Sequence, residues 1–423
     1  MATRLFGRWT RYSLLVCTAL ILLCSTGAHN SVQAAGVPAP AIDQLVQQVL
    51  LNIRANGWNP YATTHNQVTG GLYINWEMTN PSNTNVGATP TSHDPQVDLY
   101  YLNALAEYHQ LHPQDHSYDG DIQRASSQVT LDFANYNVPK GWIYFYLLHD
   151  GFLLHNSLLL AEAYLAAYNF YAHWYDPAVG LVYNGNHTTG GDYEVNHTLE
   201  CGAALLDAGK RWNRADWAQA GQSTIDHTLA ITISPRYFLF YKSMLVLPNG
   251  TQQVENYQAQ PTTQGDAVNA LVTVYNLTHN QYYLNIAGLI LSEMFNGPLL
   301  DRINGGLFFA LDMSTGALLQ SYKETRGQTL SLLGLYHYNL ALSQLGMQQQ
   351  FLAMQQQLIN LLTYNFYQPV YHGFFYRVTP TFGIYTSKPG QGYGYEDYFT
   401  TEAMGTAMDA LQQTEVPYNY TGF

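Results

Sequence analysis

The segment from Asn304 to Gly316 reads NGGLFFALDMSTG, in which a glycine pair precedes an apolar and aromatic run and a turn. A glycine followed by aromatic and aliphatic residues recurs at GLYIN (71–75), GWIYF (141–145), GLVYN (180–184), GLFFA (306–310) and GFFYR (373–377). A sixth run, RYFLFY (236–241), lacks the glycine but falls in the longest gap between the others. Self-similarity at intervals of tens of residues indicates a repeat architecture. The opening segment is therefore predicted to be one of six copies of one structural unit.

Pairs of segments with helical periodicity follow most of these runs. The pairs span residues 94–112 and 119–136, 195–212 and 214–230, 266–279 and 281–295, and 325–345 and 348–366. One further helix is expected at 41–56, before the first run, and one at 397–413, after the last. The shortest unit, between Gly141 and Gly180, shows one clear helix at 156–174 and room for a compressed second. The total is eleven helices, or twelve if that unit divides.

The two members of each pair differ in polarity. The first is apolar nearly all round, as in LSLLGLYHYNLAL (330–342), whereas the second has a polar face, as in QQQFLAMQQQLI (348–359). That difference distinguishes a helix buried on all sides from one that faces solvent. The pattern predicts an all-α fold, an (α/α)6 toroid of helical hairpins with short glycine-aromatic strands at one mouth. The helix at 41–56 would be outer and would close the ring against the last, inner helix. A superhelical solenoid of helical hairpins is the alternative.

The N-terminal residues predict secretion. Three arginines precede the apolar stretch from Leu14 to Leu23, which is too short to span a bilayer, and Val32-Gln33-Ala34 resembles a cleavage site. We therefore interpret 1–34 as a signal peptide and 35–423 as a single toroidal domain, with an uncleaved anchor as the alternative. After cleavage only Cys201 remains, so no internal disulfide is expected, and Cys201 is interpreted as a buried packing residue.

The amino-acid composition limits the classes of molecule that the protein is expected to bind. The chain has 16 basic and 29 acidic residues, a formal net charge of −13, which disfavours binding to nucleic acid or to an anionic membrane. Thirty-five tyrosines and seven tryptophans offer faces on which sugar rings stack. We expect a carbohydrate substrate, a monomer, and no membrane contact once the signal peptide is removed. Zinc-ligand spacings, phosphate-binding glycine loops and serine nucleophile motifs are missing from the sequence, so neither a metal nor a cofactor is expected.

Long loops gather at the N-terminal ends of the inner helices, where functional residues are expected. Glycoside hydrolysis needs two carboxyl groups across the scissile bond. The predicted catalytic carboxylates, each near the start of a different inner helix, are Asp94, Asp192, Glu324 and Asp397. The predicted substrate-binding residues are Trp76, Gln264, Tyr322 and Tyr395. Capping of a helix N-terminus is the structural alternative for each acidic residue. For Lys323, Glu324 and Arg326 a surface ion-pair cluster competes with a substrate clamp. For His149 and Asp150 a structural pair competes with an acid-base pair.

Three segments carry a resemblance to a known family. TQGDAVNALVTVYNLTHNQYYLNIA (263–287), GGLYINW (70–76) and LYYLNALAEYHQL (99–111) resemble the six-hairpin glycosidases, and within them the family 76 glycoside hydrolases, which are α-1,6-mannanase-like. The similarity is spread over most of the predicted mature chain. That family has an adjacent pair of catalytic aspartates before the helix at 99–111. Pro95 and Gln96 occupy those positions here, so mannanase activity does not transfer. The Lys-Glu-x-Arg stretch also resembles N-acylglucosamine 2-epimerase-like toroids.

The leading hypothesis is a secreted carbohydrate-active enzyme, a glycoside hydrolase that acts on a neutral poly- or oligosaccharide by carboxylate acid/base catalysis. A sugar epimerase or a polysaccharide lyase on the same fold is the enzymatic alternative. The absent aspartate pair makes a catalytically inactive, glycan-binding toroid the non-enzymatic alternative.

Overall fold

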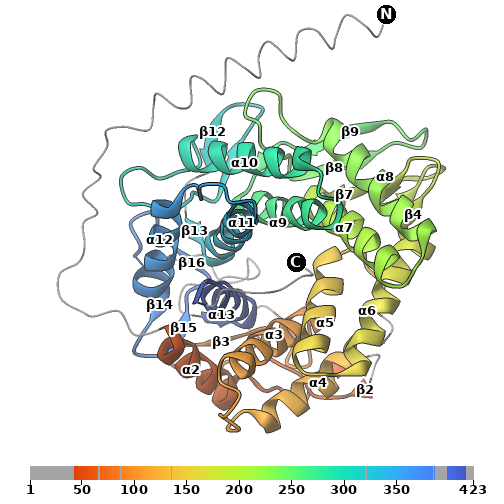
Figure 1. Cartoon of the computed structure of the whole chain (residues 1–423). Coiled ribbons are helices and arrows are strands. Elements are labelled where there is room, and N and C mark those ends of the chain that lie inside the picture. The colour runs from red at the N-terminus through yellow and green to blue at the C-terminus, as the bar shows by residue number, and fades with distance from the viewer. Residues whose placement is uncertain are drawn as a thin grey trace, which may run out of the picture. The chain divides into compact units, whose positions relative to one another are not determined.

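Twelve α-helices alternate between inner and outer positions along the described part of the chain (Figure 1). The computed structural model describes residues 42–64, 67–85, 88–134, 136–319, 322–383, 385 and 398–415. The inner helices are α3 (Pro95–Leu111), α5 (Gly141–Leu153), α7 (Val195–Arg211), α9 (Pro261–Thr278), α11 (Thr325–Gln344) and α13 (Thr401–Glu415). The outer helices are α2 (Ile42–Asn52), α4 (Asp119–Phe133), α6 (Ser157–Asn169), α8 (Ala215–Ile231), α10 (Gln281–Asn296) and α12 (Leu352–Leu361).

The inner helices form a closed ring. Each packs against the next in chain order, and α13 packs against α3. The first helix, α2, also packs against α13, as the pattern of single terminal helices predicted. The predicted (α/α)6 toroid is confirmed, and residues 40–423 form one compact unit. Within the described residues, no helix is both long and apolar enough to cross a membrane.

Burial follows the predicted inner and outer pattern. The inner helix α11 is buried along nearly its whole length, whereas α12 buries only Leu358 and Leu361. Cys201 in α7 is fully buried and forms no disulfide with any described residue. Three outer helices end in a π-helical turn, namely η2 (Ile53–Gly57), η3 (Phe170–Trp174) and η4 (Leu362–Phe366).

Short strands lie in five of the six connections from an outer helix to the next inner one; the described part of the connection from α4 to α5 has none. They are β1 (Thr63–Thr64), β2 (Gln67–Val68), β3 (Asn75–Glu77), β4 (Tyr175–Asp176), β5 (Leu181–Val182), β6 (Asn184–Asn186), β7 (Gly190–Glu194), β8 (Ser243–Val246), β9 (Gln252–Asn256), β10 (Gln258–Ala259), β11 (Ala310–Asp312), β12 (Ala317–Leu319), β13 (Lys323–Glu324), β14 (Tyr367–Gln368), β15 (Gly373–Phe374), β16 (Arg377–Val378) and β17 (Tyr398–Thr400). The largest sheet has the order β6-β7-β8-β9, and every pairing is antiparallel. Pairs such as β17 with β3, and β13 with β16, join segments from different repeats.

The segment NGGLFFALDMSTG is not an isolated hairpin. Its strand β11 pairs with β12 after the turn and also with β10 from the preceding repeat. Gly305 and Gly306 adopt φ values of +85° and +74°, which side-chain-bearing residues rarely reach, so the glycine pair is required by the backbone. The repeat identified from sequence therefore corresponds to a chain of hairpins that pair across repeat boundaries.

Two of the six runs contain no strand. RYFLFY (236–241) forms a turn and one isolated bridge, between Phe240 and Ile233. The other is the run that begins at Gly141. Gly141 and the four residues after it form the first turn of α5, and the unit from Gly141 to Gly180 holds a complete helical hairpin, α5 and α6. The expectation of a strand there was wrong because this glycine serves helix packing. A Cβ atom at Gly141 would lie 2.1 Å from the carbonyl carbon of Glu200, so α5 and α7 approach too closely for any side chain.

A side chain at the fourth position of four inner helices hydrogen-bonds the backbone of the preceding glycine-aromatic run. These pairs are Asp98 with Leu72, Thr198 with Val182, Gln264 with Phe240, and Gln328 with Leu307. The two glutamines each bond both the N–H and the C=O of their partner, as a neighbouring strand would do. We call these contacts the mouth clamps. They satisfy buried backbone groups that two- and three-residue strands leave unpaired.

Replacing either clamp glutamine with leucine should therefore destabilise the fold. Gln264→Leu and Gln328→Leu each leave one buried N–H and one buried C=O without a hydrogen-bond partner. Each substitution should lower the free energy of unfolding by about 2–4 kcal/mol. Gln356→Leu, on the exposed face of α12, is the matched control and should change it by less than about 0.5 kcal/mol. Urea denaturation of the three variants measures the difference. Unchanged stability with a selectively raised KM in Gln264→Leu would instead restore Gln264 as a sugar-binding residue.

Candidate functional site

A cavity of about 220 Å³ opens among the six inner helices. The residues that line it are Gln96, Tyr100, Asn103, Lys140, Trp142, Phe145, Tyr146, His149, Glu194, His197, Glu200, Lys242, Asp266, Asn269, Ala270, Arg326, Leu330, Leu333, His337, Asp409 and Gln413. Residues from the first turns of the helices lie toward the mouth. Residues two or more turns further along, such as His149 and His337, form the floor.

Two carboxyl groups from neighbouring inner helices face this cavity. Glu200 lies in the second turn of α7 and Asp266 in the second turn of α9. The amide of Trp142 donates a hydrogen bond to Glu200, whose Oε2 has no hydrogen-bond partner. The side-chain amide of Asn196 donates to Oδ2 of Asp266 at 3.0 Å. One oxygen of Glu200 therefore remains available to a ligand in the cavity.

The two carboxyl groups have different proton affinities. Burial raises the pKa of Glu200 well above its ordinary value, and the neighbouring Asp266 raises it further. Burial also raises the pKa of Asp266, to about 6, although Arg326 and the Asn196 amide oppose the rise. Both shifts favour the protonated form, and burial acts more strongly on Glu200 than on Asp266. Such a difference between two carboxyl groups matches the requirement for an acid and a base in one site.

Cations surround the mouth of the cavity. Lys242 forms an ion pair with Glu194 at 2.5 Å, and Arg326 forms one with Glu402. Burial alone would raise the pKa of Glu194, but His197 and Lys242 lower it below its ordinary value, so Glu194 is charged. The two ion pairs cancel their charges within the site.

Lys140 is different from the other two cations. Its Nζ donates to the side-chain oxygen of Gln96 at 2.9 Å, and no ion pair involves it among the described residues. Burial lowers the pKa of Lys140 because the ammonium group is partly removed from water. It is thus a cation held beside the cavity by a neutral amide.

Stacked aromatic rings form one wall. Tyr100 from α3 lies parallel to Trp142 from α5, with ring centroids 4.9 Å apart and planes 7° apart. Tyr146 meets both rings edge to face. Trp142 and Tyr146 are partly exposed to the cavity. Flat aromatic faces of this kind bind the C–H faces of sugar rings.

A buried hydrogen-bond network closes the floor. His337 contacts Asn269 at 2.5 Å and Gln413 at 2.7 Å, and the amide nitrogen of Gln413 donates to Glu107 and Asp409. Burial lowers the pKa of His337 to about 4 and raises the pKa of Asp409 well above its ordinary value. Burial therefore favours the neutral forms of both His337 and Asp409.

The structure places the predicted acidic residues away from the cavity wall. Asp94 is the N-cap of α3 and accepts from the backbone N–H of Gln96 at 3.1 Å. Asp192 is exposed in β7, where Asn184 donates to it at 3.0 Å. Glu324 is buried and forms an ion pair with Arg377 at 3.2 Å. None of these three lines the cavity. Asp397 lies outside the described residues, and so does the predicted sugar-binding residue Tyr395.

The other predicted binding residues are also set back from the cavity. Trp76 is fully buried against Phe399, and Gln264 is a mouth clamp with no exposed surface. Tyr322 is partly buried between Arg377 and other aromatic rings. The cluster predicted from Lys323, Glu324 and Arg326 separates in the same way. Lys323 is buried against Asp301 at 2.8 Å, and only Arg326 reaches the cavity.

Most residues that line the cavity were not predicted from the sequence as site residues. Arg326 was considered as part of a substrate clamp and His149 as part of an acid-base pair, whereas Glu200, Asp266 and Lys140 were assigned no role. One feature of the sequence could have identified these cavity-lining residues. Polar residues at helical spacing interrupt the apolar inner helices, as with His197 and Glu200 in α7. A polar stripe on a helix that is otherwise buried indicates a polar cavity.

No protein-family model and no curated protein matches the chain. Solved structures do match. An unsaturated glucuronyl hydrolase specific for heparin has a TM-score of 0.65 and 13% identity, covering 88% of this chain and 97% of that chain. The unsaturated glucuronyl hydrolase of Bacillus sp. GL1 has a TM-score of 0.60 and 12% identity, covering 88% and 96%. A family 76 α-mannanase from Bacteroides thetaiotaomicron has a TM-score of 0.61 and 13% identity, covering 89% and 97%. These are six-hairpin glycosidases, so the resemblance in fold is confirmed.

Proposed function

We propose that this protein is a glycoside hydrolase in which Glu200 and Asp266 are the catalytic carboxyl groups. The observation that carries the proposal is the pair of carboxyls on adjacent inner helices, which open onto one aromatic-walled cavity with different proton affinities. Hydrolysis of a glycosidic bond requires one protonated and one ionised carboxyl group. Six-hairpin glycosidases with the same fold support the reaction class.

The geometry favours Glu200 as the general acid. It is the more deeply buried of the two, and its proton would pass from the carboxyl to the leaving glycosidic oxygen. Asp266 is partly exposed and would act on the other side of the bond, as base toward water or as nucleophile. A sugar ring stacked on Trp142 would lie within the same cavity as both carboxyls.

A secreted enzyme for a neutral poly- or oligosaccharide is our first proposal for substrate and location. The N-terminal sequence supports secretion, and the ion pairs of Lys242 and Arg326 leave those two cations without free charge for an anionic polymer. An epimerase would leave the chain length unchanged, a lyase would give an unsaturated product, and a glycan-binding protein would release nothing. Product analysis therefore separates the proposal from each alternative.

Isosteric substitution tests the carboxyl pair. Glu200→Gln and Asp266→Asn should each lower kcat by at least about 10³-fold. The thermal midpoint should change little, because the amide replaces a protonated carboxyl at position 200 and a costly partly buried charge at position 266. Release of reducing ends from mixed oligosaccharides measures the activity. Asp192→Asn is the comparison, because Asp192 was predicted to be catalytic and is exposed in β7. Loss of activity in Asp192→Asn with retention in Glu200→Gln would reverse the assignment.

The pH profile of the wild-type enzyme offers an independent test. Since the pKa of Asp266 is raised to about 6, kcat/KM should rise as pH increases through about 6 and Asp266 loses its proton. It should fall again at higher pH, as Glu200 loses the proton that it donates. A profile that stays flat from pH 7 down to pH 4 would show that Asp266 is not the base.

A second candidate substrate is a sugar that bears a carboxylate, and Lys140 is the observation that favours it. A partly buried ammonium group whose hydrogen-bond partner is a neutral amide is stabilised by an anionic ligand. Lys140→Met should then raise KM at least about 10-fold for a uronate-containing oligosaccharide. It should leave KM for the matched neutral oligosaccharide within about twofold. Equal effects on both substrates would eliminate this candidate and favour the neutral one.

A further inference from the structure

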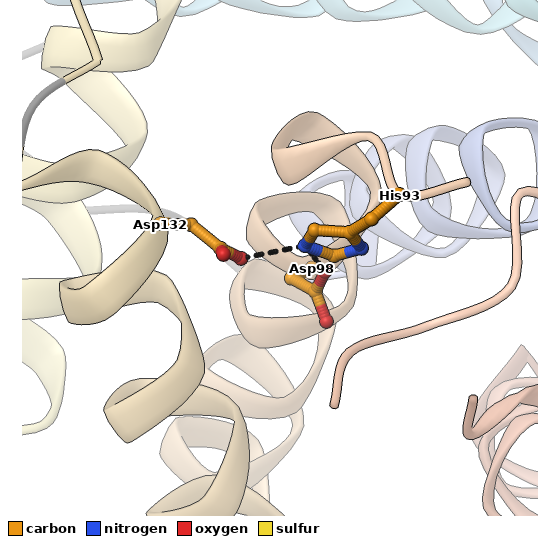
Figure 2. A group of neighbouring side chains, drawn as sticks. All are labelled: His93, Asp98 and Asp132. Carbon is orange, nitrogen blue, oxygen red and sulfur yellow. Dashed lines mark hydrogen bonds and ion pairs between the residues drawn. The ribbon is translucent and has the colours of Figure 1, made fainter. Parts of the chain in front are cut away.

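A second cluster of chemistry-bearing side chains lies outside the cavity. His93, from the segment before α3, meets Asp98 of α3 and Asp132 of α4, and Figure 2 shows both carboxylates turned toward one nitrogen of the imidazole ring. The three side chains are almost completely buried, at 1% exposure or less. None of them lines the central cavity, so the proposed hydrolysis does not use them.

Each carboxylate is oriented by a separate hydrogen bond on its other oxygen. The Oδ1 of Asp98 accepts the backbone N–H of Leu72 at 3.1 Å, as one of the mouth clamps. The Oδ1 of Asp132 accepts from the hydroxyl of Thr64 at 2.6 Å and from the amide of Gln128 at 2.9 Å. The remaining oxygen of each carboxylate, Oδ2, is thereby directed at the same point. Support of this kind is typical of residues that surround a metal ligand.

Within the cluster, one imidazole nitrogen faces two carboxylate oxygens, so there are more hydrogen-bond acceptors than donors. The Nε2 atom of His93 lies 3.2 Å from Oδ2 of Asp98 and 3.0 Å from Oδ2 of Asp132. One nitrogen carries at most one hydrogen, so it satisfies only one of the two oxygens. Oδ2 of Asp98 has no hydrogen-bond donor, although Asp98 is 1% exposed. A buried carboxylate oxygen without a donor, beside an imidazole nitrogen and a second carboxylate, is accounted for by an ion held among the three side chains.

We propose that His93, Asp98 and Asp132 bind a divalent transition-metal ion of the zinc class. Tetrahedral bonds of about 2.0–2.2 Å to such an ion place neighbouring ligand atoms about 3.3–3.6 Å apart. The distances from Nε2 of His93 to the two carboxylate oxygens, 3.2 and 3.0 Å, are within a few tenths of an ångström of that range, so small side-chain shifts would admit the ion. A neutral imidazole, two carboxylates and one divalent ion also sum to zero charge, as full burial requires. Calcium fits poorly, because it takes six or more oxygen ligands and this cluster offers nitrogen and two oxygens.

The site is structural and holds together three parts of the chain. The ion would connect the segment before α3, α3 itself and α4, and through Thr64 the hairpin of β1 and β2. Its burial leaves no position for a substrate, which distinguishes structural from catalytic sites. The sequence did not reveal it, because the ligands at positions 93, 98 and 132 follow no zinc-binding spacing.

Metal analysis of the purified protein tests the proposal directly. Mass spectrometry should find about one zinc equivalent per chain after expression with zinc, and removal by a strong chelator should lower the thermal midpoint by about 5 °C or more. Re-addition of zinc should restore it. Cobalt loaded in place of zinc should give the visible absorption of a low-symmetry site with nitrogen and oxygen ligands. The expectation of no metal, drawn from the sequence, would then be wrong.

Two variants with matched chemistry separate this site from adventitious binding. His93→Gln should remove the zinc equivalent and the chelator response. His187→Gln is the control, since His187 also contacts a buried aspartate, Asp176, at 2.9 Å, but no second carboxylate faces it. That variant should keep both the metal and the response. If His93→Gln does not fold, the metal content and the cobalt spectrum of the wild-type protein still decide whether the cluster binds a metal ion.

The proposal is overturned if the wild-type protein contains no stoichiometric metal and its thermal midpoint is indifferent to chelator and to added zinc, manganese or cobalt. It is equally overturned if His93→Gln folds and retains the zinc equivalent. Either result would mean that protons alone hold the cluster together.

Discussion

The mouth clamps are the constraint on which the arrangement of this protein depends. A ring of inner helices needs connections that return from the outer layer, and here those connections contain strands of only two to five residues. Such short strands cannot satisfy their own backbone groups, and a buried unpaired N–H or C=O costs about 1–3 kcal/mol. The fourth residue of an inner helix supplies the missing partner, as Gln328 does for Leu307. Each of the four clamps thereby attaches its connection to the inner helix that follows.

This constraint explains which features could be predicted from the sequence and which could not. The alternation of fully apolar and half-polar helices depends only on burial, so the inner and outer layers and the ring closure were predictable. The role of Gln264 could not be predicted from the sequence. A glutamine at the start of an inner helix has the same sequence appearance whether its amide faces a sugar or pairs with Phe240. Gly141 was ambiguous for a similar reason, because a glycine serves a turn and a close helix contact equally well.

Three of the predicted acidic residues, Asp94, Asp192 and Glu324, do not line the cavity, and the reason is different. The sequence draws attention to acidic residues in front of helices, where Asp94 lies, but that position favours capping of the helix N-terminus. A carboxyl group that must keep its proton belongs inside the helix, where burial outweighs the dipole. Glu200, in the second turn of α7, is such a residue. Only the three-dimensional ring shows that it shares a cavity with Asp266, because the two are separated by a whole hairpin in sequence.

The side of the ring opposite the carboxyl pair explains how the chain departs from the mannanases that it resembles. Where their aspartate pair aligns, this chain has Pro95, which starts α3, and Gln96, whose amide oxygen accepts from Lys140. That wall of the cavity therefore presents an amide, an ammonium group and the stacked rings of Tyr100 and Trp142. The residues of α3 that line the cavity include no carboxyl group. The carboxyl groups of Glu200 and Asp266 lie on α7 and α9, and for that reason the proposed hydrolysis assigns its acid and base to those two helices.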